Sequence, residues 1–177
     1  SFKKWFKGSQ VKDKDGKPMV VYHGDRTDVI NNLYSGGLWF TINPEQASDY
    51  AGIAEDLETP NVTPAYLSIK NPLDLSKVFD DFTQQSTWDD FKEGIKDLTG
   101  KYPPGPEDIN DGLTSVYLES VIKDNNSVAY EFSDLFTRRM QDFGDNYQLW
   151  AKELGYDGIM GNEDREMSYY PFDNTQI

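Results

Sequence analysis

The chain contains no cysteine and only one histidine, which excludes a disulfide framework and a thiolate zinc site. No apolar run approaches the roughly 20 residues of a membrane-spanning helix. No charged-then-apolar leader opens the sequence, so we predict no signal peptide and no transmembrane segment. Walker and Rossmann glycine fingerprints and the Gly-x-Ser-x-Gly elbow of serine hydrolases are also missing.

Positive charge is scarce, because 17 Lys and Arg stand against 31 Asp and Glu, giving a net charge of −14. Such a field repels phosphate backbones and anionic bilayers, which disfavours nucleic-acid binding and membrane docking. The 14% aromatic content distinguishes the chain from disordered sequences. We therefore expect one soluble folded domain over residues 1–177.

Hydrophobic patterns predict strands at both ends of the chain and helices between them. The segment 74–152 has apolar residues at helical spacing and is expected to be a helical insert, while the strands belong to the flanking parts. This order predicts the α+β class. The expected strands are 19–22, 38–41, 65–69, 156–160, 168–172 and 176–177, and the expected helices start at Asn43-Pro44 and near 88–98, 116–122, 131–143 and 147–154.

One acidic segment, Asp13–Pro18, superficially resembles a calcium loop. The spacing fails, however, because Tyr22 occupies the place of the bidentate glutamate. We interpret Asp15-Gly16 as a hairpin turn instead. Without a second histidine or any cysteine, no metal site is expected.

His23, the only histidine, follows the first apolar strand and precedes Gly24. A lone histidine is more often structural than catalytic, although its place at a strand end favours a cleft. Gly24 either lets a ligand approach the backbone closely or simply makes a turn. Trp39 and Tyr50 are likewise either core aromatics or two walls of a slot for a flat ring.

Taken in order, these motifs resemble the ADP-ribosyltransferase fold, in the His-Tyr-Glu branch of diphtheria-type toxins and poly(ADP-ribose) polymerases. The closer resemblance is to ADP-ribosyltransferase domains of phage polyvalent proteins. It implies a split β-sheet with flanking helices and leaves the insert 74–152 outside. The segments that carry it are Asp15–Pro18, Val20–Gly24, Tyr66–Leu73, Gly155–Ile159 and Phe172–Ile177.

The resemblance implies NAD+ as the substrate and a role for each matching residue. His23 would hydrogen-bond a hydroxyl of the nicotinamide-side ribose, and Gly24 would hold the carboxamide through its backbone. Trp39 and Phe40 would belong to the nicotinamide slot. Tyr50 would stack on the nicotinamide ring.

The sequence departs from the family pattern at two positions. Ala47 stands where the polymerases have a serine that bonds the carboxamide, so that contact is expected to be missing. Ser168 stands at the position of the catalytic glutamate, and a hydroxyl cannot stabilise a cation by charge. Glu166 would share its face if the strand extends that far. Gln176 is the other polar residue of the motif, so three candidates for the third catalytic residue remain.

The implied activity is a mono-ADP-ribosyltransferase, toxin- or effector-like and of phage or bacterial type, that transfers ADP-ribose to a protein. Its transition state resembles an oxocarbenium ion, which nearby negative charge stabilises. The alternatives are an NAD+ glycohydrolase and a degenerate NAD+-binding module, for which Ser168 is the evidence. An immunity or inhibitor protein is a further expected partner, and the expected location is the cytoplasm or a target cell into which the protein is delivered.

Overall fold

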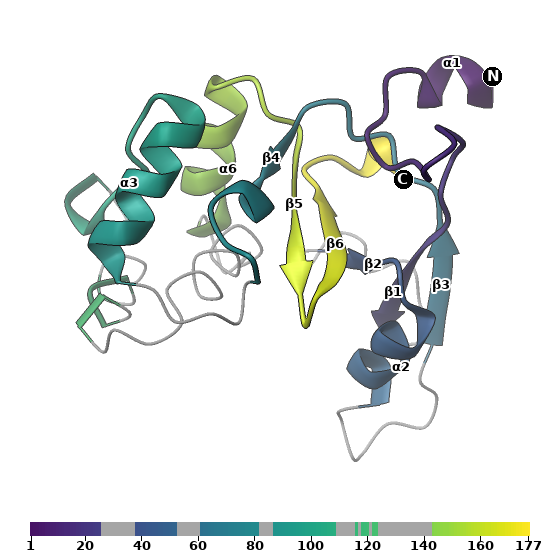
Figure 1. The fold of residues 1–177 in the computed structure, drawn as a ribbon, viewed down its shortest axis with the longest axis horizontal. Helices are drawn as coiled ribbons and strands as arrows, with labels where there is room; N and C mark the ends of the chain where they lie inside the picture. Colours follow the sequence, from purple (N-terminus) through teal and green to yellow (C-terminus); the bar gives the residue numbers. More distant parts are fainter. Residues whose placement is uncertain are drawn as a thin grey trace. The chain divides into compact units, whose positions relative to one another are not determined.

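The computed structural model describes two compact units (Figure 1). The first unit joins the beginning of the chain to its end, and the second begins at Asp74, where the sequence pattern changes from strand to helix. A single domain with an insert over residues 74–152 stays a prediction. The units are residues 1–73, 157–160 and 166–177, and residues 74–156 and 161–165. The residues described are 1–25, 38–52, 61–81, 87–108, 116, 118–120, 122–123 and 143–177.

Six strands form one sheet in the order β3-β1-β2-β6-β5-β4 (Figure 1). β1 runs antiparallel to both of its neighbours, and β2 runs antiparallel to β6. Strands from both ends of the sequence therefore meet in one sheet, as the α+β prediction required. The bounds are β1 (Val21–Asp25), β2 (Phe40–Thr41), β3 (Asn61–Ala65), β4 (Pro72–Asp74), β5 (Gly158–Glu163) and β6 (Glu166–Pro171).

The helices begin and end where local signals place them. α2 (Pro44–Gly52) begins as predicted, because Asn43 Oδ1 accepts a hydrogen bond from Glu45 N at 2.9 Å. α3 (Trp88–Thr99) ends at Gly100, whose φ of 80° suits glycine. The other helices are α1 (Phe2–Phe6) and α6 (Phe143–Glu153), with 3₁₀ turns at Leu75–Lys77, Pro106–Asp108 and Asn174–Gln176.

Two of the helices expected in the insert are described only in part. In the segment expected at 116–122, the described residues 116, 118–120 and 122–123 are helical. The helix expected at 131–143 lies outside the described residues, apart from Phe143, which begins α6.

Several strand predictions were wrong at their boundaries. β1 runs through His23 and Gly24 instead of ending before them, because both residues pair with β3. β3 precedes the expected strand 65–69, and it tolerates Pro64 because it is the edge strand of the sheet. A strand that was not predicted, β4, begins at Pro72. The C-terminal segment expected as a strand forms a 3₁₀ turn closed by a capping box.

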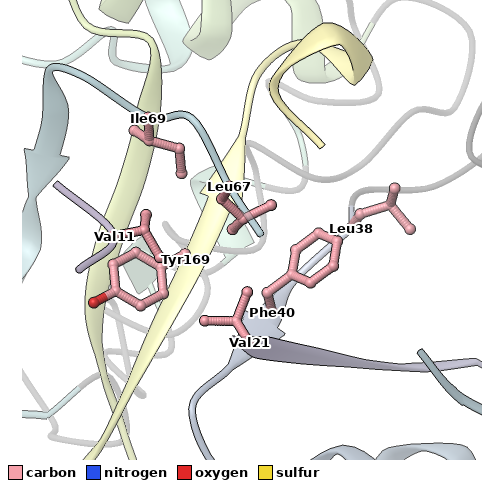
Figure 2. Close-up of a cluster of buried hydrophobic side chains, with 7 residues drawn as sticks. All are labelled: Val11, Val21, Leu38, Phe40, Leu67, Ile69 and Tyr169. Carbon is pink, nitrogen blue, oxygen red and sulfur yellow. The ribbon is translucent and has the colours of Figure 1, made fainter. Parts of the chain in front are cut away.

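The core of the first unit connects the strands that carry the candidate site. Figure 2 shows apolar side chains from β1, β2 and β6 and from the adjoining segments packed together. Burying one such side chain contributes roughly 1.5–3 kcal/mol. The cluster therefore holds these three strands in a fixed arrangement. Its members are Val11, Val21, Leu38, Phe40, Leu67, Ile69 and Tyr169.

The second unit has its own buried residues. Phe91 and Ile95 of α3 are fully buried, and the ring of Phe91 stacks on that of Phe79 with centroids 5.4 Å apart. Tyr147 of α6 is also buried, and its hydroxyl donates to the Pro104 carbonyl at 2.8 Å. Burial raises the pKa of Tyr147 well above its ordinary value, so the hydroxyl stays protonated.

Candidate active site

The candidate site begins where β1 leaves β2. β1 forms five consecutive pairs with β3, but among the described residues it pairs with β2 only at Tyr22 and Thr41. His23 lies one residue beyond that pair, and its Nδ1 is 2.8 Å from the Trp39 carbonyl oxygen. Among the described residues, the pairing of β1 with β2 therefore does not continue at His23 and Gly24.

A hydrogen bond shows which ring nitrogen of His23 carries a hydrogen. The Trp39 carbonyl can only accept, so His23 Nδ1 must carry the hydrogen. In a neutral imidazole Nε2 is then an acceptor. The half-buried ring lies 5.5 Å from that of Phe40, which supports it. Such a nitrogen can accept a hydrogen bond from a ribose hydroxyl.

Gly24 is the point at which α2 contacts β1 directly. A side-chain Cβ at Gly24 would lie 1.8 Å from the Ala47 carbonyl oxygen and 3.2 Å from Ala51 N. Ala47 and Ala51 are buried, as expected for small residues on the packed face, and Figure 1 shows α2 beside β1. Tyr50 lies between them in sequence and is 39% exposed. The packing thus fixes the helix that carries the proposed stacking tyrosine.

The two aromatic residues of β2 and the segment before it differ in exposure. Trp39 is half-buried, and its ring lies 5.4 Å from that of Tyr170 on β6. Phe40 is 2% exposed and belongs to the core cluster (Figure 2). Phe40 is therefore a core residue, and its ring also contacts that of His23.

Ser168 lies level with the β1–β2 junction. It pairs with Thr41, which in turn pairs with Tyr22. Ser168 is 2% exposed, and the neighbouring Thr41 hydroxyl donates to Gln46 Oε1 of α2. Ser168, which the family resemblance places at the glutamate position, is thus a buried, uncharged side chain.

Glu166 shares a face with Ser168, because β6 begins at Glu166 and side chains alternate along a strand. The condition set by the sequence, that the strand extend this far, is met. Glu166 is half-buried and lies about 7 Å from Ser168 along the strand, at two residues' rise.

Gln176 is occupied by backbone contacts. Its Nε2 donates to the Asp157 carbonyl at 2.8 Å and to the Ser68 carbonyl at 3.3 Å, while its Oε1 accepts from Asp173 N at 2.8 Å. The side chain thereby joins three chain segments. These bonds indicate a structural role for Gln176. Of the three candidates, Glu166 alone has a carboxylate.

Two broader properties concern the described residues as a whole. They include no group of three or more His, Asp or Glu side chains placed to hold a metal ion. No helix within the same ranges is long and apolar enough to cross a membrane.

Sequence reasoning missed Thr41 and Gln46, whose side chains form a part-buried hydrogen bond beside Ser168. It also missed the hydrogen bond between His23 and the Trp39 carbonyl. Both depend on strand register, for which the sequence contains no local signal. In the sequence, only the place of Thr41 two residues before the helix cap Asn43 suggested a polar contact. In the structure, the Thr41 hydroxyl oxygen accepts a hydrogen bond from the Asn43 N–H.

Comparison with known proteins gives one match. A family model described as ADP-Ribosyltransferase in polyvalent proteins matches residues 13–177, which include all the candidate site residues and the segment 74–152. No curated protein and no solved structure matches the chain.

Proposed function

Because this chain belongs to the ADP-ribosyltransferase family of polyvalent proteins, whose substrate is NAD+, we propose that it is a mono-ADP-ribosyltransferase acting on a protein. It breaks the bond between nicotinamide and ribose and transfers ADP-ribose to the acceptor. The observation that carries the proposal is the divergence of β1 from β2 at His23 and Gly24.

The residues at the divergence suit the nicotinamide end of NAD+. A carboxamide has donor and acceptor groups that match the backbone N–H and C=O of one residue, here Gly24. His23 Nε2 accepts from a ribose hydroxyl, since Nδ1 is engaged with Trp39. Half-buried Trp39 and exposed Tyr50 offer aromatic surfaces for the nicotinamide ring.

Cleavage requires negative charge near the developing oxocarbenium ion, because nicotinamide leaves as a neutral ring. Ser168 is uncharged and Gln176 is held by backbone groups, so we assign this role to Glu166. Glu166 lies at the start of β6, two residues and about 7 Å before position 168, where the glutamate is usual. We therefore expect slower turnover than a glutamate at position 168 would give.

The charge of the protein supports a basic protein as the acceptor. At a net charge of −14, a cationic partner is attracted and a nucleic acid is repelled. A basic surface would approach faster at low ionic strength, where screening is weak.

A second candidate function is NAD+ binding without turnover. The specific observation in its favour is Ser168, buried and uncharged at the position where the branch has its catalytic glutamate. A protein of this kind would hold NAD+ or a partner and release no nicotinamide.

The test is incubation with NAD+ labelled in the adenylate phosphate, together with a histone mixture or, as a control, an acidic protein. Label on the histones with matched nicotinamide release supports the transferase. Free ADP-ribose without labelled protein indicates a glycohydrolase. Bound NAD+ with no nicotinamide released indicates the binding module.

A further inference from the structure

We infer that His23 has a second role, in which its Nδ1–H replaces the Gly24 N–H at the Trp39 carbonyl and so keeps the backbone edge of Gly24 open for a ligand. His23 is then a positioning residue through Nδ1, in addition to its contact with ribose through Nε2. Only the identity of the ligand at that edge rests on the proposed function.

The direction of the Gly24 backbone groups follows from β3. Tyr22 stands opposite Pro64, which has no N–H, so this is a non-hydrogen-bonded pair of the antiparallel ladder. Gly24, two residues on, is also a non-hydrogen-bonded partner of β3. Its N–H and C=O therefore point away from β3 and towards β2.

The hydrogen bond between β2 and β6 independently shows which backbone groups of β2 face β1. Ile42 N donates to the Met167 carbonyl of β6 at 3.3 Å, so the backbone groups of Ile42 face β6. Those of Thr41 then face β1, as do those of Trp39 two residues earlier. In a continued ladder, Trp39 would be the hydrogen-bonded partner of Gly24.

In the structure, the His23 imidazole occupies the donor position at the Trp39 carbonyl. The Trp39 carbonyl oxygen lies 2.8 Å from His23 Nδ1, and the β1–β2 register contains only the pair Tyr22–Thr41 among the described residues. The pairing of β1 with β3 continues past Gly24 to Asp25 and Asn61. β1 therefore does not end here, and only its ladder with β2 is interrupted.

The interruption is stable because the carbonyl keeps a donor. The imidazole N–H gives the Trp39 oxygen a hydrogen bond, so this carbonyl does not require the Gly24 N–H as a donor. With the imidazole in place, the Gly24 N–H is left for a ligand. Without it, the Gly24 N–H is the donor that the ladder geometry provides, and the edge closes.

The test compares His23→Asn, which keeps a donor near the position of Nδ1, with His23→Ala, which has none. The probe is nicotinamide alone, because it has no ribose and cannot report on Nε2. We expect His23→Asn to bind nicotinamide like the parent and to lose NAD+ affinity. His23→Ala should lose about tenfold or more in affinity for both ligands.

Amide hydrogen exchange of Gly24 gives a readout that needs no ligand. The Gly24 amide should exchange readily in the parent and in His23→Asn, and about tenfold or more slowly in His23→Ala, where the ladder closes. Where His23→Ala does not fold, His23→Leu fills the volume without supplying a donor.

The outcomes separate the two proposals. Unchanged Gly24 exchange in the variants without a donor overturns the positioning role, even if NAD+ binding is lost. If the parent binds neither NAD+ nor nicotinamide, the proposed function fails, while Gly24 exchange still decides the role of Nδ1. Slower exchange with weakened nicotinamide binding supports both.

Discussion

At the scale of single residues, Gly24 shows how packing and function can require the same residue. The Ala47 carbonyl oxygen occupies the space that any side chain at this position would need. The same close approach brings α2, with Tyr50, against the strand that carries His23. A substitution here should therefore affect stability and ligand binding together.

Gly24→Ala should destabilise the fold by roughly 1–3 kcal/mol, because its Cβ would force α2 away from β1. Nicotinamide affinity should fall with it. Gly52→Ala is the matched control, since nothing lies within 4 Å of a Cβ there. Urea unfolding and nicotinamide titration measure both effects. Equal stability of the two variants would contradict the packing at Gly24.

Glu166→Gln should lower the rate of nicotinamide release by about 100-fold, the usual effect of removing a preorganised electrostatic group. Glu153→Gln removes an exposed glutamate of α6 and should leave the rate unchanged. Steady-state release from NAD+ is the measurement. A Glu166→Gln rate equal to that of Glu153→Gln would show that another group supplies the charge.

The sequence predicts His23, Gly24, Trp39 and Tyr50 as site residues because ordered family motifs mark their positions, and these assignments stay predictions. It left the third catalytic residue open among Ser168, Glu166 and Gln176, because exposure and hydrogen-bond partners are tertiary properties. Gln176 illustrates the difficulty. The motif marks it, yet only its bonds to Asp157 and Ser68 show what the side chain does.

At the scale of elements, the C-terminal 3₁₀ turn joins distant parts of the first unit. Gln176 closes a capping box with Asp173 and bonds to the carbonyls of Ser68 and Asp157. The Asp157 carboxylate in turn accepts from the backbone N–H of Lys70 and Asn71 at 2.9 and 2.8 Å. This network holds the chain segment before β4 against the start of β5.

Gln176→Ala should destabilise the protein by roughly 2–4 kcal/mol, because it leaves buried backbone groups without partners. Gln10→Ala removes an exposed glutamine whose amide donates to the nearby Gly8 carbonyl, and it should cost little. Chemical unfolding compares them. A stable Gln176→Ala variant that has lost nicotinamide release would instead indicate a catalytic role.

Thr87→Ala should destabilise α3 by about 1 kcal/mol, because the Thr87 hydroxyl accepts from Asp90 N at the helix start. Thr87→Ser keeps the hydroxyl and should retain most of that stability. The measurement is the midpoint of thermal unfolding followed by circular dichroism. Identical midpoints for the Ala and Ser variants would exclude a capping contribution.

Helix starts were predictable because capping is a local signal, as Asn43 shows at α2. Strand boundaries were less so. The expected strand 65–69 contains buried Leu67 and Ile69, but β3 covers Asn61–Ala65 and shares only Ala65 with it. Pro64 lies within β3, which accommodates it because β3 is an edge strand.

At the scale of the whole molecule, the charge of the protein and that of its proposed substrate have the same sign. The net charge of −14 opposes NAD+, so the proposed function requires local contacts that outweigh this repulsion, and we assign them to Gly24, His23 and the aromatic side chains. Salt screens the repulsion between the acidic protein and NAD+, and the local contacts then supply most of the affinity for NAD+.

NAD+ should raise the melting temperature by several degrees, since a ligand at 100 times its Kd stabilises the native state by about 2.7 kcal/mol. Thermal scans with NAD+ and with nicotinamide measure the shift. The same scans on Gly24→Ala are the control, because its binding edge is displaced. Equal shifts in the two proteins would place NAD+ binding elsewhere.

The most direct measurement is nicotinamide release from NAD+ by the purified protein, compared with the His23→Ala and Glu166→Gln variants. We expect slow but continuous release by the parent and much slower release by both variants, because one removes the ribose contact and the other the charge. Parent release no faster than that of heat-denatured protein, with NAD+ bound, would contradict an enzymatic function.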